Sequence, residues 1–570
     1  MVEIISSFVM LIPENFKILF EIGMMMIAAG LLAFIFKVFK QPQIPAYIVA
    51  GIILGPLMLG IVSNSEVIMA LSEIGIAFLL FFAGMEINFK KLKEVGKIST
   101  ITGLGEMIIV GGITVGIILG LGFKNMEIIY ATIVVAFSST MVVIKLLSDK
   151  HHLNTLHGRI IVGILLVQDI LAIIILTVLA TNLSVNTILI SLATAGGFAI
   201  IVLILAKLSE PIFKSSAKSS ELIFIVAIAF LFVFVISAYF MKLSIIIGSF
   251  FAGVALANST FKTEIKGRIH PLSDFFGAIL FVSLGMQLVW ISKEYLLMFF
   301  ILLALILIIK PLIIFLIVRL LGYTNRTAFL TGNALGQSSE FALIILIAGL
   351  ISSQISQEIF SVLVFVIIIT MSLTSYFIKY ESQLYKLHSK PARIFDRIPT
   401  RKEKLDYGLK NKKKIVIIGC HRMGSLILKK LKNKKEEVLV IDNNPEIIRA
   451  LIDKKIPSLY GDFGNPDVAE KLSFIAPEIL ISTIPDLEDN LHLLNKIKQI
   501  SKQTLVIVVA SRIDGALELY KNGADYVILP KIIGGGKIIE MTNKLKKEKG
   551  RLKRKEIGFL NELHYFLYKD

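Results

Sequence analysis

Long apolar stretches separated by short polar segments fill the first two thirds of the chain. From Ile18 to about Tyr380, apolar runs of roughly 20 residues recur, and each is long enough to cross about 30 Å of hydrocarbon. After Glu381 the pattern changes to charged segments with short apolar runs between them. We therefore expect a helical domain that crosses a membrane many times, followed by a soluble α/β domain.

The apolar runs predict thirteen membrane spans. Loops after the odd-numbered spans carry most of the Lys and Arg residues, which places these loops in the cytoplasm. The N-terminus is then outside and the C-terminal domain is cytoplasmic, as in a multi-pass plasma-membrane protein. The expected spans lie near residues 18–37, 43–60, 66–87, 98–121, 126–145, 160–181, 186–206, 220–240, 243–259, 271–289, 295–318, 327–350 and 356–378.

Composition narrows the class of protein. Of the 570 residues 55% are hydrophobic, and the mean hydropathy of +0.79 is too high for a soluble chain of this length. The net charge of +18 follows from cytoplasmic loops and a basic C-terminal segment, so we expect no nucleic-acid partner. The single cysteine, Cys420, excludes an intramolecular disulfide. We expect a transmembrane exchanger domain at 1–380, a linker at 381–412, a Rossmann-like domain at 413–535 and a basic helical tail at 536–570.

Several spans contain polar groups that a purely structural membrane helix would avoid. An ionisable side chain near the middle of a bilayer costs roughly 2.5–3.5 kcal/mol and is a functional candidate by default. Glu73 and Glu106 also lie within spans. The candidate ion-site residues are Ser138, Ser139 and Thr140 in span 5, Gln168 and Asp169 in span 6, Lys310 in span 11, and Gln337, Ser338 and Glu340 in span 12.

The positions of these polar groups favour a transporter. Polar triplets near the middle of two spans predict helices that are broken in the membrane, with freed backbone groups that line a cavity. Secondary transporters build ion sites at the membrane midplane in this way. An aspartate beside such a site can bind a cation and a proton in turn, so we expect a monovalent cation and protons to compete at Asp169.

Five motifs, taken in order, resemble the monovalent cation:proton antiporter-2 family, and within it the Kef-type potassium/proton antiporters. They are "QPQIPAYIVAGIILGP" (41–56), "LLFFAGMEI" (79–87), the "QD" pair at 168–169, "LFVSLGMQL" (280–288) and "GQSSEF" (336–341). The resemblance covers nearly the whole chain.

The resemblance implies a thirteen-helix fold of two inverted repeats, in which a core moves against a dimerisation domain in elevator fashion. Spans 5 and 12 would be broken and would cross near Asp169, the family's essential ion-binding position. The neutral Gln168 is the Kef-like pattern, which goes with potassium and with one-for-one, electroneutral exchange. Lys310 would approach Asp169 or a carbonyl group, and competition for Asp169 would argue against that stoichiometry.

The C-terminal domain alternates apolar strands with helices. "KKIVIIGCHRMG" predicts a strand, a phosphate-binding turn and a helix, and the next strand ends at Asp442, a ribose acceptor. The middle glycine of the fingerprint is replaced by His421. The domain resembles potassium-transport nucleotide-binding (TrkA-N) domains, so we expect an adenine nucleotide such as NAD(H) or AMP as regulator. The candidate contacts are Gly419, His421, Arg422, Met423, Gly424, Asp442 and Asp462.

Three other functions were weighed against potassium/proton exchange. A sodium/proton antiporter of the same fold differs only in the cation, and a nucleotide-gated potassium channel would lack coupling to protons. A membrane-anchored dehydrogenase is disfavoured because no substrate domain follows the nucleotide-binding pattern. We expect a homodimer, while an ancillary regulatory subunit and gating by a thiol metabolite stay open.

Overall fold

Two compact units divide the chain, and each is described by itself. The computed structural model describes residues 13–62, 66–86, 96–123, 126–150, 152–153, 155–179, 185–217, 219–241, 243–392, 395, 406–408, 413–431, 437–461, 475, 477–501 and 503–538. The membrane unit comprises residues 1–153 and 157–398, and the tail unit comprises 154–156 and 399–570. Of the expected basic tail, residues 539–570 lie outside the described residues.

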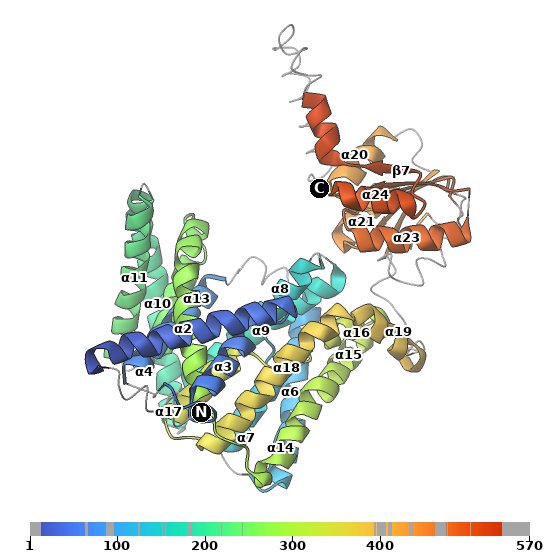
Figure 1. Cartoon of the computed structure of the whole chain (residues 1–570). Helices are drawn as coiled ribbons and strands as arrows, with labels where there is room; N and C mark the ends of the chain where they lie inside the picture. Colours follow the sequence, from blue (N-terminus) through green and yellow to red (C-terminus); the bar gives the residue numbers. More distant parts are fainter. Residues whose placement is uncertain are drawn as a thin grey trace. The chain divides into compact units, whose positions relative to one another are not determined.

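Helices build the described part of the membrane unit (Figure 1). The long central stretches of apolar, non-proline residues favour this state. The helices are α2 (Glu14–Val38), α3 (Gln43–Leu54), α4 (Glu66–Glu86), α6 (Lys97–Gly120), α7 (Met126–Ala136), α8 (Thr140–Asp149), α9 (Leu156–Leu179), α10 (Val185–Ser216), α11 (Ser220–Phe240), α12 (Ile245–Leu256), α13 (Lys262–Met286), α14 (Lys293–Ala304), the π-helical turn η1 (Leu305–Ile309), α15 (Lys310–Leu320), α16 (Asn325–Ala334), α17 (Glu340–Ile351), α18 (Gln357–Lys379) and α19 (Glu381–Ala392).

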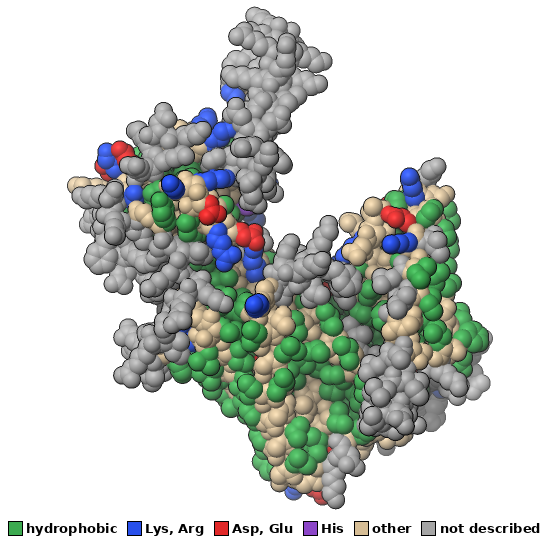
Figure 2. All heavy atoms as spheres, turned by 180° about the vertical axis from the view of Figure 1, so that it is seen from behind, with side chains coloured by type: hydrophobic (Ala, Val, Ile, Leu, Met, Phe, Trp, Pro, Cys, Tyr) green, Lys and Arg blue, Asp and Glu red, His purple; other side chains and the backbone are tan. Residues whose placement is uncertain are grey.

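The helices follow the spans expected from the sequence. Each expected span lies on one helix or on consecutive helices, such as α7 with α8 and α16 with α17. Within the described residues, nine helical segments are long and apolar enough to cross a membrane, and α3, α12 and α17 are shorter apolar helices. Hydrophobic side chains cover much of the face of the membrane unit seen in Figure 2. The helical membrane fold is therefore confirmed, while the count of thirteen crossings stays a prediction.

Glycine residues allow two pairs of helices to cross at very short distance. A Cβ atom at Gly51 of α3 would lie 2.0 Å from the carbonyl oxygen of Val282 in α13. A Cβ atom at Gly84 of α4 would lie 2.3 Å from the carbonyl oxygen of Phe250 in α12. Small residues permit such backbone contact in membrane helices. In the numbering of the expected spans, α3 and α13 are spans 2 and 10, and α4 and α12 are spans 3 and 9. Spans 2 and 3 lie seven positions before spans 9 and 10, so the shift that relates two inverted repeats converts one pair into the other.

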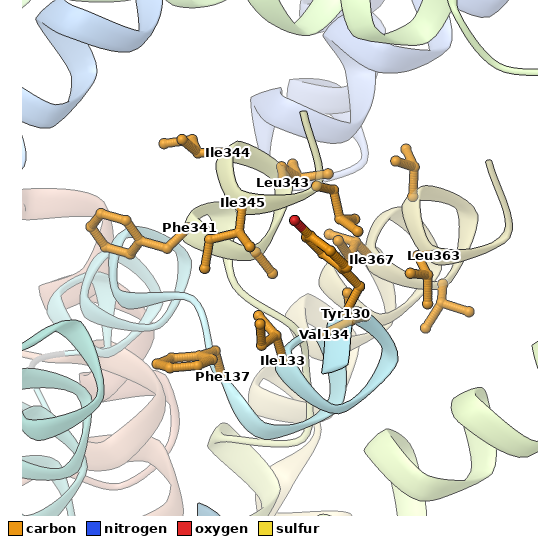
Figure 3. Close-up of a cluster of buried hydrophobic side chains, with 14 of the residues drawn as sticks. Tyr130, Ile133, Val134, Phe137, Phe341, Leu343, Ile344, Ile345, Leu363 and Ile367 are labelled. Carbon is orange, nitrogen blue, oxygen red and sulfur yellow. The ribbon is translucent and has the colours of Figure 1, made fainter. Parts of the chain in front are cut away.

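A second packing centre surrounds the broken helices. Buried residues of α7, α17 and α18 form one hydrophobic cluster with residues of α14 and η1. Figure 3 shows the α7 side chains packed against those of α17 and α18; those labelled are Tyr130, Ile133, Val134, Phe137, Phe341, Leu343, Ile344, Ile345, Leu363 and Ile367. This cluster packs α7 and α17 against α18 on the apolar sides of the two broken helices.

A seven-stranded sheet in the order β1-β4-β3-β2-β5-β6-β7 forms the centre of the tail unit. Strands β2 to β7 are parallel, and β1 pairs antiparallel with β4. The elements are β1 (Asp406–Tyr407), β2 (Ile415–Ile418), α20 (Arg422–Lys430), β3 (Val438–Asp442), α21 (Pro445–Asp453), β4 (Ser458–Tyr460), β5 (Ile479–Ser482), α23 (Leu487–Ile500), β6 (Leu505–Val509), α24 (Ile513–Lys521) and β7 (Tyr526–Ile528).

The tail unit has the doubly wound arrangement that the sequence predicts. Its strand order reverses between β2 and β5, which is where such sheets bind ligands. Strand β2 (IVII) is short, β-branched and mostly buried, as expected for a central parallel strand, and alternate residues of β5 (ILIS) are buried. The segment 381–412, which the sequence predicts to be a linker, contains two further elements, helix α19 and strand β1.

Candidate functional site

Two helices of the membrane unit are interrupted in the middle, at the polar segments singled out in the sequence. Residues 137–139 separate α7 from α8, and residues 335–339 separate α16 from α17. Each second half begins at a serine cap. Ser139 Oγ accepts a hydrogen bond of 3.3 Å from Val142 N, and Ser339 Oγ accepts one of 3.1 Å from Phe341 N. These caps satisfy N–H groups that a membrane helix cannot leave unpaired.

Side chains from each break bind the backbone of the other break. Ser138 Oγ donates to the carbonyl oxygen of Leu335 at 3.0 Å, and Ser338 Oγ donates to that of Val134 at 2.6 Å. Gln337 Nε2 donates to the carbonyl oxygen of Ser139 at 3.3 Å. The two breaks are therefore in direct contact, and the carbonyl groups released by one are partly satisfied by the other.

Two carboxylates meet the first turn of α8. Asp169 of α9 is partly exposed, and its two oxygens accept hydrogen bonds of 2.9 and 3.0 Å from Thr140 Oγ1. Glu340 is buried, and its Oε1 accepts a bond of 3.1 Å from Met141 N. The N-terminal end of a helix favours negative charge at this place.

Gln168 faces a different set of groups from its neighbour Asp169. Its side chain is fully buried, and its Oε1 accepts a hydrogen bond of 3.0 Å from Ser138 N. Its Nε2 donates to Glu106 Oε2 at 2.9 Å and lies 3.4 Å from the carbonyl oxygen of Ala136. Gln168 therefore links helix α6 to the break in α7.

Lys310 is also fully buried and lies on the Gln168 side of the breaks. Its ammonium group donates to the carbonyl oxygens of Val135 and Phe137, both at 3.0 Å, and to that of Gln337 at 3.1 Å. These three bonds use all the hydrogens of the ammonium group. Glu106 Oε1 lies 3.8 Å from Lys310 Nζ and completes a buried ion pair.

The structure brings the nine expected ion-site residues together around the two breaks, but in two groups. Thr140, Asp169 and Glu340 form one group, and Gln168 and Lys310 belong to the other. Within the described residues, Lys310 bonds to carbonyl oxygens and makes no hydrogen bond with Asp169. Glu106, a polar residue of span 4 that does not belong to the expected ion-site residues, lies at the breaks with the second group.

The phosphate turn of the tail unit follows strand β2. Gly419 has a φ of +81°, which favours glycine, and a Cβ atom there would lie 2.6 Å from Thr483 Oγ1. A Cβ atom at Gly424 would lie 1.9 Å from the carbonyl oxygen of Gly419, so only glycine fits there too. The His421 side chain is exposed, helix α20 begins at Arg422, and Met423 is half-buried. The two glycines thus pack closely where α20 begins, and the N-terminal end of a helix favours a phosphate.

Asp442 ends strand β3 beside this turn. Its carboxylate accepts hydrogen bonds of 2.6 Å from Cys420 N and 2.8 Å from Asn444 N. Burial raises the pKa of Asp442, and these two N–H groups oppose that rise. Asp442 thus fixes the turn and can still accept a bond from a ribose. Asp462, the other acidic candidate, lies outside the described residues.

Known proteins resemble both units. Residues 24–379 match the family described as sodium/hydrogen exchanger, transmembrane, and residues 415–530 match the TrkA-N domain. The glutathione-regulated potassium-efflux system protein KefC of Escherichia coli strain K12 is 28% identical over 492 residues, which cover 84% of this chain and 77% of that protein.

Two solved structures are similar to parts of the chain. The sodium proton antiporter MjNhaP1 from Methanocaldococcus jannaschii at pH 8 is 20% identical, covers 64% of this chain and 96% of its own, and gives a TM-score of 0.49. The TrkA-N domain of inner membrane protein ybaL from Escherichia coli is 19% identical, covers 23% of this chain and 98% of its own, and gives a TM-score of 0.22.

Proposed function

The chain belongs to the family of transmembrane sodium/hydrogen exchangers, and we propose that it exchanges potassium ions for protons at Asp169, one for one. It is a cation/proton antiporter with a TrkA-N domain, and a transporter rather than an enzyme. We further propose which cation is exchanged, how many protons move with it, which helices move and how the tail unit regulates transport.

The surroundings of Asp169 carry the proposal. Within the described residues, the hydrogen bonds to its two oxygens come from one neutral hydroxyl, that of Thr140, so a cation or a proton can neutralise the carboxylate. Two further buried acceptor atoms, Glu340 Oε2 and Gln337 Oε1, have no hydrogen-bond partner within the described residues. Buried acceptors are rarely left unpaired, and oxygen atoms are the ligands that replace the hydration shell of an alkali cation. A cation bound beside Asp169 would satisfy them.

One observation supports the stoichiometry, and another supports potassium as the cation. The neutral Gln168 leaves one acidic residue of the "QD" pair to be loaded, which suits the exchange of one cation for one proton. The relative from Escherichia coli is named a potassium-efflux system protein. Sodium is the alternative, because the oxygen atoms around Asp169 can bind either ion.

Alternating access is proposed to follow the division of the membrane unit into two sets of helices. The glycine crossings lock α3 to α13 and α4 to α12 into one set. The helix breaks join α7, α8, α16 and α17, with Asp169 of α9, into the other. A rigid movement of the second set against the first would carry the ion between the two sides of the membrane. The tail unit would bias this movement by binding an adenine nucleotide in one of two conformations.

Transport by the purified full chain in proteoliposomes tests the proposal. Internal pH is followed after an inward gradient of potassium or of sodium, with choline as the control for leak. We expect potassium to drive proton efflux at a rate several times that with sodium at equal concentration. Faster exchange with sodium would replace potassium by sodium as the substrate. Cation flux without proton movement would indicate a channel and overturn the antiport mechanism.

A further inference from the structure

A third acidic side chain lies at the helix breaks, on the side away from Asp169. Glu106 of α6 has no exposed surface, and its two oxygens meet different groups. Oε2 accepts the hydrogen bond from Gln168, while Oε1 accepts no bond from a described residue and faces Lys310 Nζ at 3.8 Å. A carboxylate at this depth is costly unless a positive charge accompanies it.

The contacts of Lys310 show what this pair holds in place. Its ammonium group binds carbonyl oxygens on both breaks, two from residues 135 and 137 and one from Gln337. In the chain, Lys310 directly follows the π-helical turn η1. Such turns are frequent at functional sites. A Cβ atom at Gly332 would lie 2.4 Å from the carbonyl oxygen of Pro311, so α16 approaches α15 closely beside Lys310. One cation thus joins the two breaks.

Gln168 suits its position because it both donates and accepts. Its amide nitrogen donates to Glu106, and its amide oxygen accepts from Ser138 N in the break. A carboxylate in its place could not donate, and it would put a second negative charge at hydrogen-bond distance from Glu106. The negative charge that balances Lys310 therefore comes from α6 rather than from α9.

We propose that Glu106 is the permanent counter-ion of Lys310, and that this pair, bridged by Gln168, is a positioning device that holds the two helix breaks together during transport. The inference rests on the proposed antiport function. The pair carries no cargo: Glu106 and Lys310 keep their charges throughout the cycle, and Asp169 alone is loaded and unloaded. Glu106 and Lys310 act on the ion only through the breaks that shape its site.

Moving the carboxylate from α6 to α9 tests the proposal. Four chains are compared: wild type, Glu106→Gln, Gln168→Glu and the double variant Glu106→Gln/Gln168→Glu. The first single variant leaves Lys310 unbalanced, and the second places two carboxylates side by side. The double variant restores one carboxylate, one amide and the bond between them. Glu73→Gln, the same change at an exposed residue of α4, is the matched control.

Two readouts separate positioning from ion binding. Each single variant should unfold roughly 5–10 °C below wild type, and the double variant should recover most of this difference. The maximal exchange rate should fall about tenfold in the single variants and recover in the double. The cation concentration for half-maximal rate should stay within about twofold of wild type in all of them. The Glu73 variant should match wild type in every measurement.

Other outcomes would overturn the proposal. A Glu106→Gln chain with wild-type stability and rate would show that Lys310 needs no counter-ion. A large rise in the half-saturating cation concentration at unchanged stability would make Glu106 an ion ligand. If the single variants do not accumulate, Glu106→Gln/Lys310→Met must accumulate better than Lys310→Met alone, or the pair is refuted. The unfolding data stand even if wild type shows no exchange, which would refute the proposed function instead.

Discussion

Gln168 and Asp169 are neighbours on one helix, yet their side chains lie in two regions that differ in how a negative charge is balanced. On the Asp169 side, the carboxylate accepts its hydrogen bonds, among the residues that the structure describes, from the hydroxyl of Thr140, a neutral donor that a cation can accompany or replace. On the Gln168 side, Glu106 and Lys310 are both present and both fully buried. A helix turns by about 100° per residue, which separates the two environments.

The difference shows how one helix can carry a mobile charge beside a fixed one. A carboxylate without a protein cation needs a partner from solution, so its loading depends on the ions on each side. A carboxylate with a buried lysine is already neutralised, and separating that pair is expensive. Exchange therefore depends on the first region, and the geometry of the helix breaks depends on the second.

The largest effect is expected at Asp169. Asp169→Asn keeps the size and the hydrogen bond from Thr140 but removes the charge that binds a cation and a proton in turn. We expect a folded protein whose exchange falls to the rate of protein-free liposomes. Asp149→Asn, at the exposed end of α8, is the control and should exchange like wild type. Exchange by the Asp169 variant near the wild-type rate would remove Asp169 from the mechanism.

Outside the spans, the carboxylate of Glu381 belongs to a cluster of charged side chains. It begins α19, is buried, and lies 2.9 Å from Lys150 Nζ and 3.3 Å from His152 Nδ1. Burial alone would raise the pKa of Glu381, but the hydrogen bond from His152 and the charges of Lys150, His152 and His157 lower it from 4.5 to about 2. Since the folded-state pKa is lowered, the stability gained is present above pH 4.5 and is lost as pH falls toward 2.

Thermal unfolding as a function of pH tests this contribution. Glu381→Gln should be less stable than wild type at pH 7 by roughly 3 kcal/mol at most. The difference should shrink as the pH falls below 4.5. Glu358→Gln, at an exposed residue of α18, should unfold like wild type at each pH. A constant difference between the Glu381 variant and wild type down to pH 3 would show that its charge does not stabilise the junction of α18 and α19.

The smallest effect concerns the carboxylate of the tail unit. Asp442 accepts hydrogen bonds from Cys420 N of the phosphate turn and from Asn444 N of its own turn. Asp442→Ala should weaken the binding of an adenine nucleotide by about 1–3 kcal/mol, the value of a charged hydrogen bond. Calorimetry on the full chain with NADH and with AMP measures this loss, and Asp442→Asn keeps one acceptor as the control. Equal affinity in the Ala variant would place the nucleotide elsewhere.

Much of the fold can be predicted from local patterns. Apolar runs gave the membrane helices, and the segments "FSST" and "LGQSS" gave both breaks, because serine favours a cap over the middle of a helix. In the tail unit, β-branched runs gave the parallel strands around the phosphate turn. These features depend on residues that are close together in the sequence, so they can be predicted from it.

The partners of Lys310 could not be predicted in the same way. Two of its three carbonyl groups lie more than 170 positions away in the chain and become available only where α7 ends. Glu106 is one acidic residue in an apolar run, and nothing near it indicates that α6 lies beside α15. The short strand β1 was missed for the same reason, since it is defined by its pairing with β4.

The balance point of the exchange tests the central claim most directly: Asp169 alone is loaded while Glu106 and Lys310 stay paired. Wild-type proteoliposomes receive a roughly tenfold potassium gradient, and equal thiocyanate on both sides holds the membrane potential at zero. The pH difference at which proton flux stops is then measured. One-for-one exchange predicts balance at a pH difference of about one unit, equal to the potassium ratio. Balance at about half a unit would mean that two protons move per potassium ion, and a second group at the breaks would then have to carry charge.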